Sequence, residues 1–171
     1  MNSQPQYPLL KRHLLPFCLF VCTTFFYVAA NAQEQPPKPI TVTVNTLQNL
    51  NFGTFVLGNG SGTSVIISSE GARSWTGNIV LISSSFSAAL YTVNAIPGTL
   101  ITITNGSDAI LTGSNGGSMT MHIGNSFPLS PFITTGNETT VTIGGTLTVG
   151  ASGANPPGIF SGTFSVTFIQ Q

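Results

Sequence analysis

The residues that could carry out chemistry are few and lie far apart in this sequence. After residue 32 the chain contains one histidine, His122, and one aspartate, Asp108, beside many serines. A Ser-His-Asp site could be built from these types, but no Gly-x-Ser-x-Gly motif is present and no helix is predicted to display one. His122 is instead expected on the polar face of a strand that contains Met119, Met121 and Ile123. We therefore predict that the protein is not an enzyme.

The same scarcity argues against a bound metal ion or cofactor. Metal sites need clustered His, Cys, Asp or Glu, and here Glu70 and Glu138 lie on separate segments from the other candidate ligands. The glycine-rich run at residues 113–117 has neither the lysine nor the following helix of a phosphate-binding loop. Paired carboxylates for glycoside hydrolysis are not indicated either. The sequence predicts no cofactor and no metal.

Residues 1–32 have the pattern of a secretory signal peptide. Lys11 and Arg12 precede an apolar run over residues 14–30, and Ala30, Asn31 and Ala32 form a small-x-small cleavage site. A retained membrane helix is the alternative, but the run is short for a membrane span and is interrupted by polar residues. We predict cleavage after Ala32, export to the periplasm, cell surface or extracellular space, and no membrane insertion afterwards.

The remaining composition is that of one uncharged domain. Removal of 32 from 171 residues leaves 139, which is enough for a single domain with a core. This part has no cysteine, so disulfides do not contribute to its stability. Its two positive and four negative side chains give a net charge of −2, and no basic patch suits nucleic acid. We expect a proline-rich leader over residues 33–39 and one domain over residues 40–171.

Short segments of alternating apolar and hydroxyl residues predict an all-β fold. The run at residues 77–83 is continuously apolar, which favours a strand buried on both faces. Gly144 and Gly145 separate two alternating segments and predict the turn of a tight hairpin. Because turn residues recur throughout and no helical period is found, the sequence favours an antiparallel β-sandwich, immunoglobulin-like or pilin-like. Further strands are expected at residues 40–44, 63–68, 88–95 and 99–104.

The C-terminal segment, residues 158–171, has the most regular alternation. It predicts one long strand with an apolar face and a hydroxyl face. A chain end this apolar must be buried against its own domain, another subunit or a membrane. The apolar face is made by Phe160, Gly162, Phe164, Val166 and Phe168, and the hydroxyl face by Ser161, Thr163, Ser165 and Thr167.

Four sequence motifs together resemble one bacterial secreted family. They are Leu-Asn-Phe-Gly at residues 50–53, Pro-Gly-Thr-Leu at 97–100, Gly-Thr-Leu-Thr-Val-Gly at 145–150, and the alternating segment at 158–168. Their order and spacing resemble the family known as "domain of unknown function 4402", over essentially the whole predicted domain. The family name implies no function.

The C-terminal segment is also similar to the end of chaperone-usher pilus subunits. Those subunits have a glycine fourteenth from the C-terminus, which is Gly158 here, and an aromatic penultimate residue, where this chain has Gln170. The resemblance implies an incomplete sandwich that is completed by a strand from a periplasmic chaperone and then from the next subunit. Ile40, Val42 and Val44 alternate as such a donor strand would, or they form the first strand of a complete domain.

These observations lead to two main functional hypotheses. The first is a structural or adhesive surface protein, a fimbria-like subunit whose partners are further copies of itself or a periplasmic chaperone. The second is a monomeric surface module that binds carbohydrate or another ligand through Trp75 or Tyr91. A small outer-membrane barrel is disfavoured by short strands and absent aromatic girdles. The first hypothesis assigns strand pairing between subunits to Ile40, Val42, Val44, Gly158, Phe160, Phe164, Val166 and Phe168.

Overall fold

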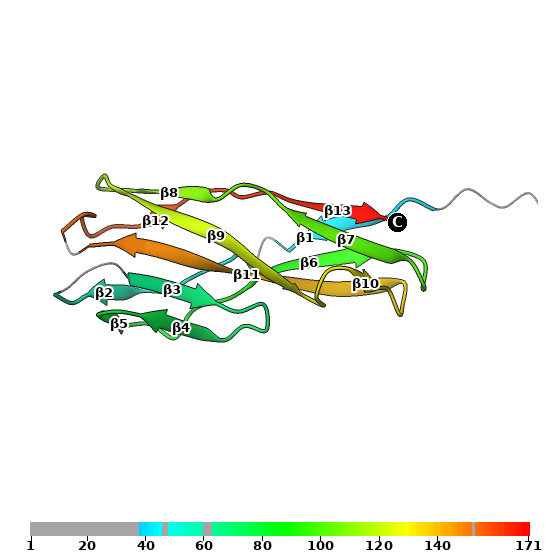
Figure 1. The fold of residues 1–171 in the computed structure, drawn as a ribbon, viewed down its shortest axis with the longest axis horizontal. Coiled ribbons are helices and arrows are strands. Elements are labelled where there is room, and N and C mark those ends of the chain that lie inside the picture. Colours follow the sequence, from blue (N-terminus) through cyan, green and yellow to red (C-terminus); the bar gives the residue numbers. More distant parts are fainter. Residues whose placement is uncertain (1–37, 46–47, 60–62, 152) are drawn as a thin grey trace, which may run out of the picture. The chain divides into compact units, whose positions relative to one another are not determined.

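Alternating apolar and hydroxyl side chains form β-strands throughout the described part of the chain. The computed structural model describes residues 38–45, 48–59, 63–151 and 153–171, and its regular elements there are all strands (Figure 1). The predicted signal peptide and residues 33–37 of the predicted leader lie outside the described residues. The strands are β1 (Thr41–Val44), β2 (Phe55–Leu57), β3 (Thr63–Ile67), β4 (Arg73–Thr76), β5 (Ile79–Leu81), β6 (Ala89–Asn94), β7 (Leu100–Asn105), β8 (Ala109–Gly113), β9 (Ser118–Phe127), β10 (Phe132–Ile133), β11 (Glu138–Gly150), β12 (Phe160–Ser161) and β13 (Val166–Gln170).

Strand β11 is the centre of the largest sheet. One of its edges pairs with β9, and the other pairs first with β6 and then, further along, with β3. The sheet continues from β6 to β1, from β3 to β4, and from β9 to β8 and β12. All of these pairs are antiparallel. Strands β6 and β3 therefore follow one another along a single edge of β11 (Figure 1).

Two smaller sheets, β10-β7-β13 and β2-β5, complete the fold. Ile101 of β7 and Ile79 of β5 are buried in the same hydrophobic cluster as Val93, Val141 and Ile143 of the large sheet. Each fully buried aliphatic side chain of this kind contributes about 1.5–3 kcal/mol to stability. Lys38–Gln171 form one compact unit. The prediction of an all-β antiparallel sandwich is confirmed.

The C-terminal segment is not one long strand, as predicted, but two short ones. Strand β12 pairs with β8, whereas β13 pairs with β7 in a different sheet. Residues 162–165 connect them, and the Gly106 amide donates a hydrogen bond to the Ser165 carbonyl at 2.9 Å. Gly106 allows this close approach, because an added Cβ would lie 2.8 Å from the same carbonyl oxygen. The alternation survives the break, since Phe160, Phe164 and Phe168 all pack against the core.

The prediction of a hairpin turn at Gly144 and Gly145 is wrong. Both glycines lie inside β11, and neither has the positive φ that a two-residue hairpin turn requires. Their lack of a side chain serves packing instead. A Cβ on Gly144 would overlap the carbonyl oxygen of Ile67 and lie 2.7 Å from the Ser68 carbonyl carbon. The glycine therefore lets the end of β3 approach β11.

The run at residues 77–83 is not buried on both faces. It forms the three-residue strand β5, whose one neighbour among the described strands is β2. Ile79 is buried, but Val80 and Ile82 are 55% and 61% exposed. An apolar run indicates a doubly buried strand only when layers cover both of its faces, and here the two-stranded sheet covers the core with one face.

We expect substitution of Gly144 by alanine to destabilise the protein. The new methyl group must displace the end of β3, so the free energy of unfolding should fall by about 1–3 kcal/mol, which urea denaturation can measure. Gly136 is the matched control, because its φ is ordinary and an added Cβ would find its nearest neighbour at 3.7 Å. Gly136→Ala should change stability by less than about 0.5 kcal/mol. Equal effects of the two substitutions would contradict the packing role of Gly144.

Candidate functional site

The predicted donor strand is paired with its own domain in this structure. Strand β1 runs antiparallel to β6, with Val42 opposite Val93 and Val44 opposite Tyr91. Ile40 and Val42 pack against the hydrophobic core. Among the described strands, β1 is a terminal strand of the large sheet and has a hydrogen-bonded neighbour on one edge only.

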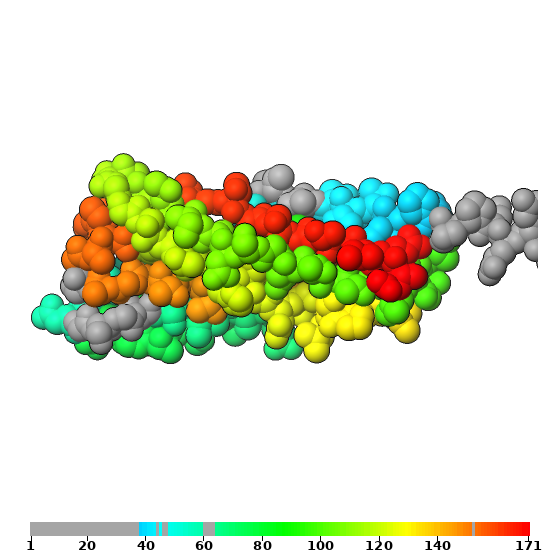
Figure 2. Space-filling view, turned by 45° about the horizontal axis from the view of Figure 1, so that its top comes forward, coloured from blue at the N-terminus to red at the C-terminus, as the bar shows by residue number. Residues whose placement is uncertain are grey.

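The C-terminal candidates also pack within the domain. Phe160 lies opposite Gly113 in the β12–β8 pair, and Phe164, Val166 and Phe168 are partly buried against the core. Within the described part of the chain, β13 has one hydrogen-bonded neighbour, β7, so it too is an edge strand. The ring centroid of Phe168 lies 5.5 Å from that of Tyr91 in β6, the strand with which β1 pairs. Figure 2 shows β1 and the C-terminal strand side by side on the surface. Gly158 is exposed just before β12.

The two aromatic candidates for ligand binding occupy different environments. Tyr91 is only 7% exposed and its ring packs on Phe168, so it belongs to the core. Its burial raises the pKa of the phenol above the ordinary value of 10.0, because the charged form loses its hydration. Trp75 lies on β4, an outer strand of the large sheet, and is 49% exposed. Of the two, Trp75 alone presents its ring to solvent.

His122 on the outer face of β9 and Asp108 just before β8 form an exposed hydrogen-bonded pair. The Nδ1 atom of His122 lies 2.7 Å from the Asp108 carboxylate, and both side chains are more than half exposed. Met119, Met121 and Ile123 are buried on the opposite face of the strand, as predicted. Among the described residues, the hydrogen-bond partner of the His122 ring is Asp108, and no serine bonds to it. The described part of the chain also contains no group of three metal-ligating side chains.

Arg73 is a residue to which sequence analysis assigned no role. Its guanidinium donates hydrogen bonds to the carbonyl oxygens of Phe52, at 3.2 Å, and of Ser83. The same group lies 4.5 Å from the centroid of the Phe86 ring. Arg73 therefore joins β4 of the large sheet to the segment before β2 and to the segment after β5. Charge-assisted bonds of this kind are stronger than neutral ones, so the cation has a structural role.

A groove of about 760 Å³ runs between β2 and the segment that leads into β12. We call it the apolar groove, because its floor includes Leu111, Met119, Leu147 and Val149 of the large sheet. Strand β2 pairs with β5 along one edge, and β5 does not line the groove, so the other edge of β2 borders it. These residues come from distant segments and have the sequence pattern of ordinary core residues. The sequence therefore carries no signal for the groove.

The comparisons with known proteins identify a family that is described as having an unknown function. The family model described as "Domain of unknown function (DUF4402)" matches residues 41–169, a range from β1 into β13. Neither a curated protein nor a solved structure matches the chain. Among the described residues no helix has the length and hydropathy of a membrane span.

We expect the stability of the protein to fall at alkaline pH because of Tyr91. The raised pKa means that unfolding lets the phenol ionise more easily, so stability is unaffected below about pH 10 and falls as the pH rises toward the folded-state pKa. Tyr91→Phe keeps the ring contact with Phe168 but has no ionisable group. Urea midpoints measured at about pH 8 and about pH 11 should therefore differ less for the variant. The same alkaline loss in both proteins would exclude Tyr91 as the cause.

Proposed function

The chain belongs to the DUF4402 family, which assigns it no activity, and we propose that it is a non-enzymatic structural or adhesive protein of the cell surface whose chains associate by pairing β-strands. Further copies of the same chain are its main partner, and a periplasmic chaperone would hold the chain before assembly. Export is supported by the signal-peptide pattern of residues 1–32.

The chemistry of the sheet edges carries this proposal. Strands β1, β2, β4, β5, β10, β12 and β13 of the described chain each have a single hydrogen-bonded neighbour. Among them β4 alone contains a charged residue, Arg73, and none contains proline. Monomeric proteins usually protect edge strands with lysine, proline or inward charges, because a bare edge pairs with other chains. The few charges of this protein also give little electrostatic repulsion between copies.

Strand β1 is the segment best suited to pass between copies. It is four residues long, lies near the start of the described chain and is bonded to β6 alone. If β1 of one chain replaced β1 of the next, the same backbone hydrogen bonds and the same core contacts would form. Such an exchange leaves the folded-state energy almost unchanged, which makes it a low-cost route to association. Strand β13 is a second candidate edge beside it (Figure 2).

A mixed-disulfide experiment tests exchange of β1 directly. Thr43 of β1 lies opposite Thr92 of β6. One full-length preparation carries Thr43→Cys and another carries Thr92→Cys, both in a Cys18→Ser, Cys22→Ser background. A disulfide between the two proteins forms efficiently when β1 of one chain pairs with β6 of the other. We expect this heterodimer after mixing at high concentration and oxidation, as a band on a non-reducing gel.

In the control, the Thr92→Cys protein is mixed with a Thr112→Cys variant in place of Thr43→Cys. Thr112 is exposed on β8, and two strands separate β8 from β6 in the sheet. Random collisions would give the same yield of heterodimer in both mixtures. Light scattering on the unmodified protein gives an independent measure of association. If the yields are equal and the protein stays monomeric at high concentration, strand pairing is excluded and the binding-module hypothesis takes its place.

A further inference from the structure

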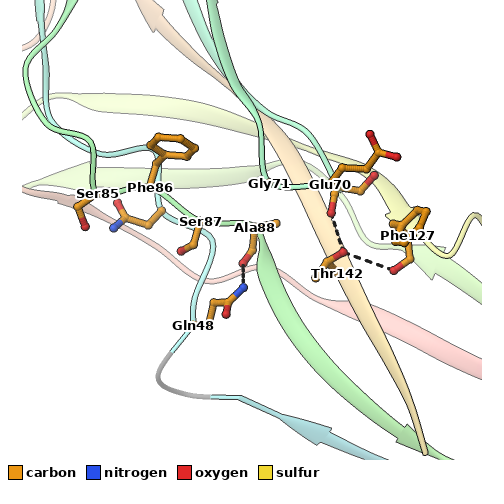
Figure 3. Close-up of a pocket in the computed structure, with 11 residues that line it drawn as sticks. Gln48, Glu70, Gly71, Ser85, Phe86, Ser87, Ala88, Phe127 and Thr142 are labelled. Atoms are coloured by element: carbon orange, nitrogen blue, oxygen red, sulfur yellow. Dashed lines mark hydrogen bonds between the residues drawn. The ribbon is translucent and has the colours of Figure 1, made fainter.

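A second, more polar recess lies where β6 and β3 meet along the edge of β11. We call it the polar notch. Strand β6 pairs with β11 up to Ile143, and β3 pairs with it from Gly145 onward, so the ends of the two strands meet beside Gly144. The notch has a volume of about 800 Å³ (Figure 3). Its lining includes Gln48, Asn51, Glu70, Ser85, Phe127 and Thr142.

Phe127 reaches this notch because of a β-bulge in β9. Gly145 pairs with Ile123 and Ile143 with Ser126, so two residues of β9 oppose the single Gly144 of β11. The extra residue reverses the alternation: Ile123 and Ser126 are both buried, while Phe127 is 55% exposed. Without the bulge Phe127 would face the core. Bulges often redirect a side chain beside a functional site.

The bulge is held in place by the opposite sheet. The Nδ2 group of Asn105, at the end of β7, donates hydrogen bonds to the carbonyl oxygens of Gly124 at 3.0 Å and Ile123 at 3.3 Å. Thr142, in the floor of the notch, donates its hydroxyl to the Ser69 carbonyl at 2.6 Å, which fixes the β3–β4 turn (Figure 3). The walls of the notch are therefore preformed, which lowers the entropic cost of binding.

The notch offers neutral hydrogen-bonding groups, one carboxylate and one open aromatic face. Within the described chain the Glu70 carboxylate makes no hydrogen bond or ion pair, and it lies on the same side of the notch as Phe127 (Figure 3). The Gln48 amide donates to the Ala88 carbonyl at 3.3 Å, which positions its oxygen as an acceptor. Phe86 lies on the far side, and its ring is already covered by Arg73.

We propose that the polar notch is a saccharide-binding site. An aromatic ring packs against the C–H face of a sugar ring, while carboxylate and amide groups accept hydrogen bonds from its hydroxyls. An anionic ligand is disfavoured because Glu70 lies in the lining and because Arg73, whose guanidinium lies over the Phe86 ring, already donates to two carbonyl groups. Phenylalanine with a single carboxylate is also a weak site for a cation, since tryptophan binds cations best. A neutral saccharide matches the groups that remain.

The test uses defined oligosaccharides and the protein purified from cells that express the full sequence. Chitohexaose, cellohexaose and maltohexaose are titrated separately, and binding is followed by saturation-transfer NMR and calorimetry. We expect at least one of them to bind with a Kd on the order of millimolar or tighter. Phe127→Ala should weaken that binding about tenfold, and Glu70→Gln should weaken it less, because the amide oxygen still accepts a hydrogen bond.

Trp75→Ala is the matched control, because Trp75 is an exposed aromatic residue that does not line the notch. It should leave the affinity unchanged, and thermal denaturation of each variant confirms that the fold is intact. Failure of all three sugars to bind would overturn the proposal. So would affinity that depends on Trp75 but not on Phe127. None of these outcomes depends on whether the chains pair strands.

Discussion

The continuity of β11 past Gly144 is the constraint on which the rest of the structure depends. Because this position has no side chain, the end of β3 can approach β11 closely, and β6 and β3 can share one edge of the strand. On the other edge β9 must accommodate the same point, which it does with the bulge at Gly124 and Asn125. The junction of β6 and β3 on one edge of β11 and the bulge on its other edge therefore meet at the same glycine of the central strand.

Arg73 provides the second constraint, between the layers rather than within one. Arg73 is partly buried, and the two hydrogen bonds from its guanidinium to the Phe52 and Ser83 carbonyls offset part of the hydration that the charge loses. Gly53 has no room for a side chain beside the same guanidinium. The β2-β5 sheet is thus held to the large sheet by a polar contact as well as by Ile79 and its apolar neighbours. Arg73 is thus one of the few charged residues of the domain, and its hydrogen bonds help to hold the β2-β5 sheet in place.

The sequence was sufficient for features that depend on local alternation. Strand β1 and the Met119–Met121–Ile123 face of β9 were predicted because period-two patterns persist wherever one face is buried. The Gly144 hairpin was mispredicted because sequence does not distinguish a glycine needed for positive φ from one needed for close packing. The polar notch could not be predicted, because Gln48, Glu70 and Phe127 are distant in sequence and the bulge reverses the parity of Phe127.

Strand pairing would use β6 and saccharide binding the segment before it, so one does not prevent the other. Strand β1 pairs with Tyr91 to Asn94, whereas the notch is lined by Ser87 and Ala88 before the strand begins. Gln48, which follows β1, is bonded to its own domain: the Leu90 amide donates to its carbonyl at 3.1 Å and its side-chain amide donates to Ala88. A chain that gave its β1 to a neighbour would therefore keep Gln48 in its own notch. Every subunit of such an assembly would present a complete notch, so that weak binding at each one adds up along the polymer.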